Sequence, residues 1–72
     1  MKVLVFQTNI DTQHSVEVIS PLFNNHKGII DWSVDTEDID KVMRVEANEH
    51  LNESDIINLM IGQGFYCGDL VS

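Results

Sequence analysis

The side chains of this chain that could bind a metal ion through nitrogen or sulfur are few and widely spaced. With the N-terminal amine, they are His14, His26, His50 and Cys67. His14 lies in a polar segment, residues 8–15, that follows an apolar run. Histidine nitrogen and cysteine sulfur are ligands for Zn(II) or Cu(I), and zinc sites usually have three or four protein ligands.

Each of these residues also has a structural interpretation. A cysteine in a strand, as we expect for Cys67, most often acts as a small buried hydrophobic residue. His14, near a helix start, would be solvated. His26, beside Lys27 at a helix end, would complement the helix dipole. His50 would lie in a loop. For each of these residues the sequence favours the structural interpretation over a ligand role.

Groups for catalysis do not form a recognisable arrangement. Ser15 directly follows His14, and adjacent residues on a helix point about 100° apart. A Gly-rich turn that could bind phosphate is absent from the sequence. The acidic residues between positions 31 and 40 lack the regular ligand spacing of a calcium loop. We therefore expect a protein that is not an enzyme.

Length and composition predict one globular domain over residues 1–72. The single cysteine cannot form an internal disulfide, which fits a reducing cytoplasm. No apolar run approaches the roughly 18 residues that cross a membrane. Met1-Lys2 leads directly into an apolar strand, so we expect no signal peptide.

The formal net charge is -8, from 12 acidic residues against 4 Lys or Arg. A negative field repels nucleic acid and anionic membrane surfaces. It favours a basic protein partner or a cation.

Hydrophobic periodicity predicts six elements in the order strand, helix, strand, strand, helix, strand. Their expected ranges are residues 2–8, 13–25, 29–35, 41–47, 53–62 and 65–71. This order predicts an α+β, ferredoxin-like βαββαβ sandwich with a four-stranded antiparallel sheet of order 4-1-3-2. Right-handed crossovers would place both helices on one face of that sheet.

Local signals refine the expected elements. Asp11 or Thr12 should cap the first helix, and Pro21 should kink it or tighten its end. Gly28, after that helix, is free to take a left-handed conformation. Alternation in the second strand predicts a buried face formed by Ile30, Trp32 and Val34.

The second helix has more apolar side chains than one buried stripe requires. Either Ile57 or Ile61 should therefore point outward or lie under the chain's connections. An exposed Ile57/Ile61 patch beside Asp55 would suit a protein interface. Burial of both isoleucines in a small domain is the alternative.

A family resemblance covers nearly the whole chain. The residues that support it are Phe6, Thr8-Asn9-Ile10, Val16, Pro21, Gly28-Ile29, Trp32, Val34-Asp35-Thr36, Asp40-Lys41-Val42, Ile56 and Gly64-Phe65. With these residues the chain resembles the small heavy-metal-associated domains of copper chaperones and of the N-terminus of metal-pumping ATPases. The resemblance implies the same ferredoxin-like fold.

In that family, two cysteines separated by two residues hold Cu(I) or another soft metal at the end of the loop after the first strand. In this chain their positions fall on Thr12 and Ser15, whose neutral hydroxyls are poor ligands for a soft ion. The resemblance therefore implies a degenerate member without the Cys-x-x-Cys pair. We expect a cytoplasmic protein-interaction or accessory module of a metal-handling system. The alternative is a metal carrier of copper-chaperone type that holds Cu(I) or Zn(II) with His14, Cys67 and Asp11. The resemblance places His14 in the register of the missing pair and Cys67 near the metal loop, and this set of ligands is short by the usual count.

Overall fold

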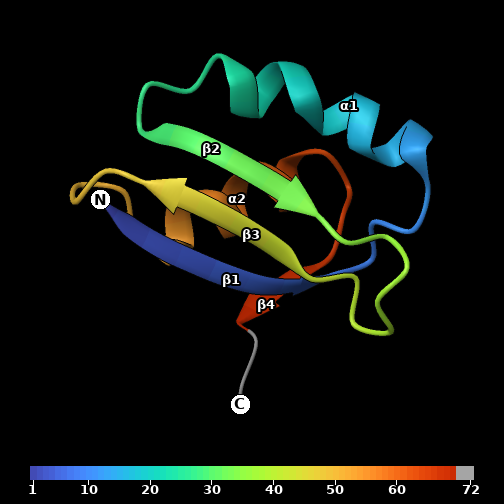
Figure 1. The fold of residues 1–72 in the computed structure, drawn as a ribbon. Helices are drawn as coiled ribbons and strands as arrows, with labels where there is room; N and C mark the ends of the chain where they lie inside the picture. Colours follow the sequence, from blue (N-terminus) through green and yellow to red (C-terminus); the bar gives the residue numbers. More distant parts are fainter. Residues whose placement is uncertain (70–72) are drawn as a thin grey trace.

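The six predicted elements form, in the predicted order, in the computed structural model, which describes residues 1–69 (Figure 1). They are β1 (Lys2–Thr8), α1 (Gln13–Asn24), β2 (Ile29–Val34), β3 (Met43–Ala47), α2 (Glu53–Gly62) and β4 (Cys67–Asp69). The ranges of β1 and α2 agree with the prediction at both ends. The last strand begins later than predicted, at Cys67, and the predicted residues 70 and 71 lie outside the described part of the chain.

The four strands form one antiparallel sheet in the order β2-β3-β1-β4. The central strand β1 pairs with β3 along residues 2–6 and with β4 along residues 6–8. Both helices cover the same face of the sheet, and the opposite face is open (Figure 1). The α+β, ferredoxin-like arrangement with order 4-1-3-2 is therefore confirmed.

The hydrophobic core lies between the sheet and the two helices. Along β1 and β3, buried residues alternate with more exposed ones, because successive side chains of a strand point to opposite faces. The fully or almost fully buried side chains of this core include Phe6, Ile19, Phe23, Met43, Val45, Ile56 and Met60. Every helix and both central strands therefore contribute to one core.

The strand β2 departs from the predicted alternation because it contains an irregularity in its pairing with β3. The register shifts between Ile29 and Asp31, as in a β-bulge. The extra residue, Ile30, is 59% exposed, whereas Ile29 packs against the core. The prediction that Ile30 shares the buried face of Trp32 and Val34 is therefore wrong. One inserted residue reverses the two-residue alternation on one side of the shift.

The ends of α1 also refine the prediction. Thr12, rather than Asp11, is the N-cap, and the helix continues through Pro21 to Asn24. Gly28 does not take the left-handed conformation that the sequence allowed. Among the described glycines, only Gly64 has a positive φ, 86°. Gly28 instead allows close packing, since an added Cβ would lie 3.2 Å from the side chain of Leu51.

Within residues 1–69, neither helix has the length and apolar character needed to cross a membrane.

Candidate functional site

The loop between β1 and α1, residues 9–12, is held by a buried threonine at the end of β1. The Thr8 hydroxyl donates to the backbone oxygen of Lys41 at 2.6 Å and accepts from the backbone N–H of Ile10 at 3.2 Å. Ile10 is fully buried and anchors the loop in the core. Since both partners of the hydroxyl are backbone groups, Thr8 fixes the path of this loop and of the hairpin end beside it.

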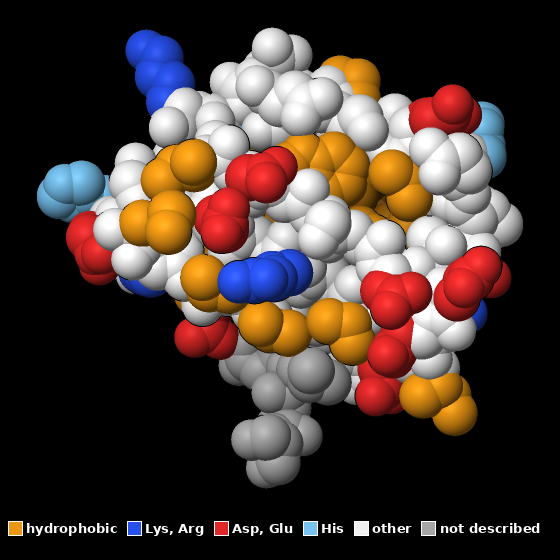
Figure 2. Space-filling model, viewed as in Figure 1, with side chains coloured by type: hydrophobic (Ala, Val, Ile, Leu, Met, Phe, Trp, Pro, Cys, Tyr) orange, Lys and Arg blue, Asp and Glu red, His pale blue; other side chains and the backbone are white. Residues whose placement is uncertain are grey.

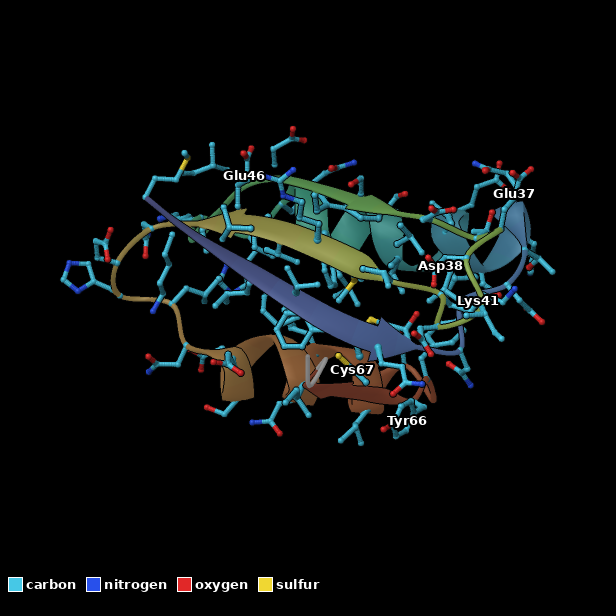
Figure 3. All side chains as sticks on the ribbon, turned by 60° about the horizontal axis from the view of Figure 1, so that its bottom comes forward. Glu37, Asp38, Lys41, Glu46, Tyr66 and Cys67 are labelled. Carbon is cyan, nitrogen blue, oxygen red and sulfur yellow. The ribbon has the colours of Figure 1, made fainter. Side chains whose placement is uncertain are left out.

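Asn9 connects the same loop to the segment that enters β4. Its side-chain oxygen accepts from the backbone N–H of Tyr66 at 2.9 Å. Tyr66 lies directly before β4, next to Cys67 (Figure 3). Thr8, Asn9 and Ile10, which support the family resemblance before the turn, therefore set the shape of the loop.

The hydroxyl groups at the two cysteine positions of the family are bonded to each other. Thr12 Oγ1 donates to Ser15 Oγ at 3.1 Å and accepts from the Ser15 backbone N–H at 3.1 Å. The second contact makes Thr12 an N-cap, which satisfies one of the free N–H groups at the helix start. Both side chains therefore have a structural use in this loop.

The three proposed metal ligands occupy different environments. Asp11 and His14 are exposed, whereas Cys67 is buried, and the sheet register places it opposite Thr8. Among the residues that the structure describes, no three or more His, Cys, Asp or Glu side chains group closely enough to hold a metal ion. The structure therefore does not bring His14, Cys67 and Asp11 together as one ligand set.

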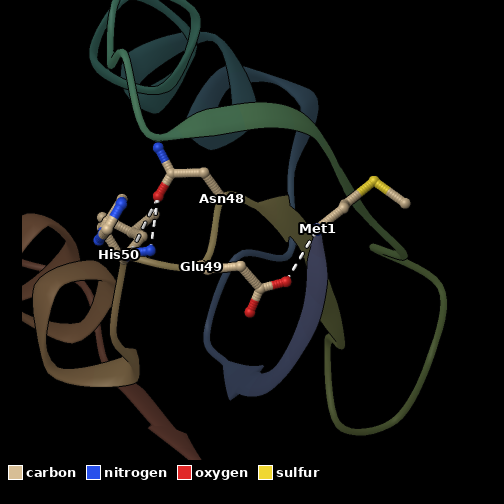
Figure 4. Close-up of polar contacts among 5 residues, drawn as sticks. Met1, Asn48, Glu49 and His50 are labelled. Atoms are coloured by element: carbon tan, nitrogen blue, oxygen red, sulfur yellow. Dashed lines mark hydrogen bonds and ion pairs between the residues drawn. The ribbon is translucent and has the colours of Figure 1, made fainter.

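The other two histidines lie away from this loop. The Nδ1 atom of His26 accepts from the backbone N–H of Gly28 at 3.0 Å, so this ring supports the turn between α1 and β2. His50 is exposed in the turn after β3. Its backbone N–H donates to the side-chain oxygen of Asn48 at 2.9 Å (Figure 4).

Of the two isoleucines predicted to form a partner surface on α2, one is turned to solvent. Ile61 is 60% exposed. Ile57 is half-buried and packs against the core. The second helix therefore presents a single exposed isoleucine rather than a continuous Ile57/Ile61 patch.

The open face of the sheet carries apolar side chains that were not among the predicted partner-binding residues. Val3 and Val5 of β1 are 43% and 38% exposed. The ring of Tyr66 lies over Gly68, because a Cβ on this glycine would meet the tyrosine hydroxyl at 2.7 Å. Gly68 pairs with Gln7. Phe6 and Thr8 are buried on the inner face, so Gln7 between them points to the open face. Tyr66, which lies over Gly68, therefore extends over the open face. The signal for this surface was present in the sequence, since both faces of β1 are apolar.

Charged side chains of β2 and β3 lie beside the apolar row. Arg44 stands opposite Val5, and Glu46 stands opposite Val3. A hollow of about 90 Å³ on this face is lined by Asp31, Trp32, Ser33, Arg44 and Glu46. Figure 2 shows this face, with hydrophobic side chains beside cationic and acidic groups near its centre. In the described part of the chain, Arg44 forms no salt bridge with either carboxylate of the hollow.

The hairpin loop between β2 and β3 adds more negative charge at one end of the sheet. Its acidic residues are Asp35, Glu37, Asp38 and Asp40, and they surround Ile39, which is 93% exposed. The one cation of this segment, Lys41, has a positive φ of 48° and donates from Nζ to the backbone oxygen of Thr36 at 2.9 Å. The loop, seen in Figure 3, is therefore an ordered acidic projection.

An ion pair at the N-terminus changes the pKa of one carboxyl group. The N-terminal ammonium of Met1 lies 2.8 Å from Glu49 Oε1 (Figure 4). A hydrogen bond from the ammonium and its positive charge lower the pKa of Glu49 below the ordinary value of 4.5. This contact ties the beginning of β1 to the turn after β3.

Comparison of the chain with protein-family models, curated proteins and solved structures found no match. Function must therefore be inferred from the side chains of the loop and of the open face.

Proposed function

We propose that this chain is a heavy-metal-associated-like domain that has lost its metal-carrying pair. It acts as a non-enzymatic protein-interaction or accessory module of a cytoplasmic metal-handling system. The contact between Thr12 and Ser15 carries this proposal. The two positions that would supply thiolates supply hydroxyls, and one of these hydroxyls caps α1.

The loop supports this proposal because hydrogen bonds and burial within the chain hold its shape. Thr8 and Asn9 hold the backbone through hydrogen bonds to distant segments, and Ile10 is buried. A soft ion prefers thiolate or thioether sulfur to a neutral hydroxyl. The one cysteine nearby, Cys67, is buried on the inner face of the sheet.

The surface supports an interaction role. Large apolar side chains are exposed at several places, among them Val3 and Ile39. The net charge of -8 favours a basic partner. A small domain whose loop is occupied by its own hydrogen bonds still offers these surfaces to another protein.

A titration of the reduced protein with Cu(I) and Zn(II), followed by amide shifts in NMR spectra, tests the proposal. We expect no stoichiometric binding by the natural chain. The double variant Thr12→Cys/Ser15→Cys should gain tight Cu(I) binding, because it restores a thiol pair at the helix start. The single variant Thr12→Cys is the matched control, and it should bind Cu(I) far more weakly than the pair.

Two results would overturn the proposal in different ways. Tight stoichiometric binding by the natural chain, centred on residues 11–15 and 67 and lost in His14→Ala/Cys67→Ser, would establish the carrier function instead. Failure of the folded Thr12→Cys/Ser15→Cys variant to bind Cu(I) would show that the register of the resemblance is wrong.

A further inference from the structure

We propose that the open face of the sheet docks a basic, amphipathic segment of a partner protein. This inference rests on the interaction role proposed above and names its surface. The docking face consists of the apolar row Val3, Val5 and Tyr66 with the charged hollow lined by Asp31, Ser33, Arg44 and Glu46.

The apolar row differs from the exposed isoleucines of the hairpin loop and of α2. Val3 and Val5 come from one strand, and Tyr66 reaches the same face by lying over Gly68. Ile39 and Ile61 lie instead on separate elements, the hairpin loop and α2. Single exposed apolar residues are normal on a protein surface, whereas a group of them on one face marks an interaction site.

Position within the sheet makes this row unusual. β1 is a central strand, hydrogen-bonded to β3 on one side and to β4 on the other. A strand at the centre of a sheet presents the middle of its face, which is the part that a docked segment covers best. Polar side chains would serve a permanently solvated face, yet valine occupies two successive outward positions of β1.

The charged side chains around the apolar row favour a basic partner segment. The hollow has two carboxylates, Asp31 and Glu46, and one guanidinium, so its own charge is negative. Within the described residues, neither carboxylate is neutralised by a salt bridge to Arg44. A lysine or arginine side chain of a partner would complement the hollow, while apolar side chains of the same segment would cover Val3 and Val5.

The hairpin loop extends the same preference to one end of the face. The loop has four carboxylates and a single cation, Lys41. The ammonium group of Lys41 already donates to the backbone oxygen of Thr36. Figure 2 shows acidic side chains gathered at this end of the molecule, beside the docking face. Long-range attraction by these groups would steer a basic segment toward the face.

The same charge distribution disfavours two other occupants. A second copy of the chain carries the same net charge of -8, so face-to-face association would bring two acidic molecules together. Nucleic acid is repelled by the same field. A basic protein segment is the occupant that satisfies both the apolar row and the surrounding charge.

A binding experiment with the isotope-labelled full chain tests this docking face. The probe is a synthetic peptide of alternating Leu and Lys, about ten residues long, which can lie extended along a strand. One control peptide alternates Ser and Lys and keeps the charge without the apolar side chains. A second control peptide alternates Leu and Glu and keeps the apolar side chains with the opposite charge.

We expect the Leu-Lys peptide to shift the amide signals of residues 3–5, 31–33 and 44–46. The Ser-Lys peptide should bind at least about tenfold more weakly than the Leu-Lys peptide, because it lacks the apolar contacts. The Leu-Glu peptide should leave the spectrum unchanged. Added salt should weaken binding of the Leu-Lys peptide, since part of its attraction is between exposed charges.

Matched variants locate the binding on the protein. Val5→Thr replaces a valine that is 38% exposed on the docking face, and Val18→Thr replaces one that is 39% exposed on α1. Val5→Thr should weaken peptide binding severalfold, and Val18→Thr should not. Glu46→Gln should likewise weaken binding, whereas Glu17→Gln, on the exposed surface of α1, should have little effect.

The outcomes separate this inference from the proposed function. Absence of Leu-Lys binding, equal effects of Val5→Thr and Val18→Thr, or concentration-dependent shifts of the same face without peptide would each overturn the docking proposal. Binding centred on Ile61 would overturn this face but leave an interaction module in place. Metal binding by the natural chain would overturn the proposed function, while the peptide result would still decide the docking face.

Discussion

The loop between β1 and α1 and the open face of the sheet differ in what their side chains do for the fold. In the loop, polar side chains have partners within the chain: Thr8 and Asn9 hold backbone groups, and Thr12 bonds to Ser15. On the open face, Val3 is partly exposed, and the charged groups around the hollow are not joined by salt bridges in the described part of the chain.

This difference indicates which region is available for binding. Hydrogen-bonding groups that already satisfy backbone atoms cannot take up a ligand without leaving those atoms unpaired, which costs free energy when they are buried. Val3 and Val5 of the open face make no such bonds and lose only their contact with water when covered, while Asp31 accepts from the backbone N–H of Trp32 at 2.9 Å. The loop that resembles a metal site therefore stabilises the fold, whereas the open face exposes the side chains that we propose dock a partner.

Replacement of Thr8 should give the largest loss of stability among these variants. A small loss would contradict the difference between the loop and the open face. Thr8→Val keeps the shape of the side chain but leaves Lys41 O and Ile10 N without their partner. We expect a loss of about 2 kcal/mol in the free energy of unfolding, measured by urea denaturation. The reverse exchange on the open face, Val5→Thr, should change it by less than about 0.5 kcal/mol. Equal losses in the two variants would show that the regions do not differ.

Separation of the two hydroxyls at the cysteine positions should give an intermediate effect. Thr12→Ala removes the oxygen that caps α1 and should cost about 1 kcal/mol in the free energy of unfolding. Ser15→Ala leaves the backbone N–H of Ser15 bonded to Thr12, so it should cost less than about 0.5 kcal/mol. The difference between the two variants in urea denaturation measures the cap alone. A larger loss for Ser15→Ala would contradict the assignment of Thr12 as the cap.

The sequence predicted local features of the fold better than features that depend on distant pairing. The ranges of β1 and α2 followed from periodicity and turn residues and agree with the structure. The outward turn of Ile30 did not follow, because it arises from the register of β2 against β3. Likewise, the predicted order 4-1-3-2 placed β1 at the centre of the sheet, but it did not show which of its faces the helices leave open.

The candidate site shows the same division. The register of the resemblance identified Thr12 and Ser15, and capping preference allowed Thr12 as the N-cap. The sequence could not show that Asn9 would bond to the backbone of Tyr66, because these residues are 57 positions apart. The residue types did favour a buried Cys67 and a solvated His14, and the structure confirms both environments.

Substitution of Gly68 should give a small effect that sharpens the description of the open face. In Gly68→Ala, the new methyl group meets the hydroxyl of Tyr66, so the flexible ring should move away while the strand pairing remains. We expect stability to change by less than about 0.5 kcal/mol. Loss of the nuclear Overhauser contact between the Tyr66 ring and residue 68, with an unchanged Gln7 amide shift, would be the expected signature. A shifted Gln7 amide would show that Gly68 serves the pairing itself.

The ion pair between the N-terminus and Glu49 should give the smallest effect, because its two groups are 55% and 68% exposed. The ammonium lowers the pKa of Glu49, so the contribution of this pair is present above the ordinary value of 4.5. It is lost as the pH falls through the lowered folded-state pKa. Acetylation of the N-terminus removes the charge and should raise the Glu49 midpoint in an NMR titration of its carboxyl carbon. The urea midpoint of Glu49→Gln should differ little from that of the natural chain at any pH. An unchanged Glu49 midpoint after acetylation would show that this contact does not persist in solution, and that only the pairing with β3 holds the start of β1.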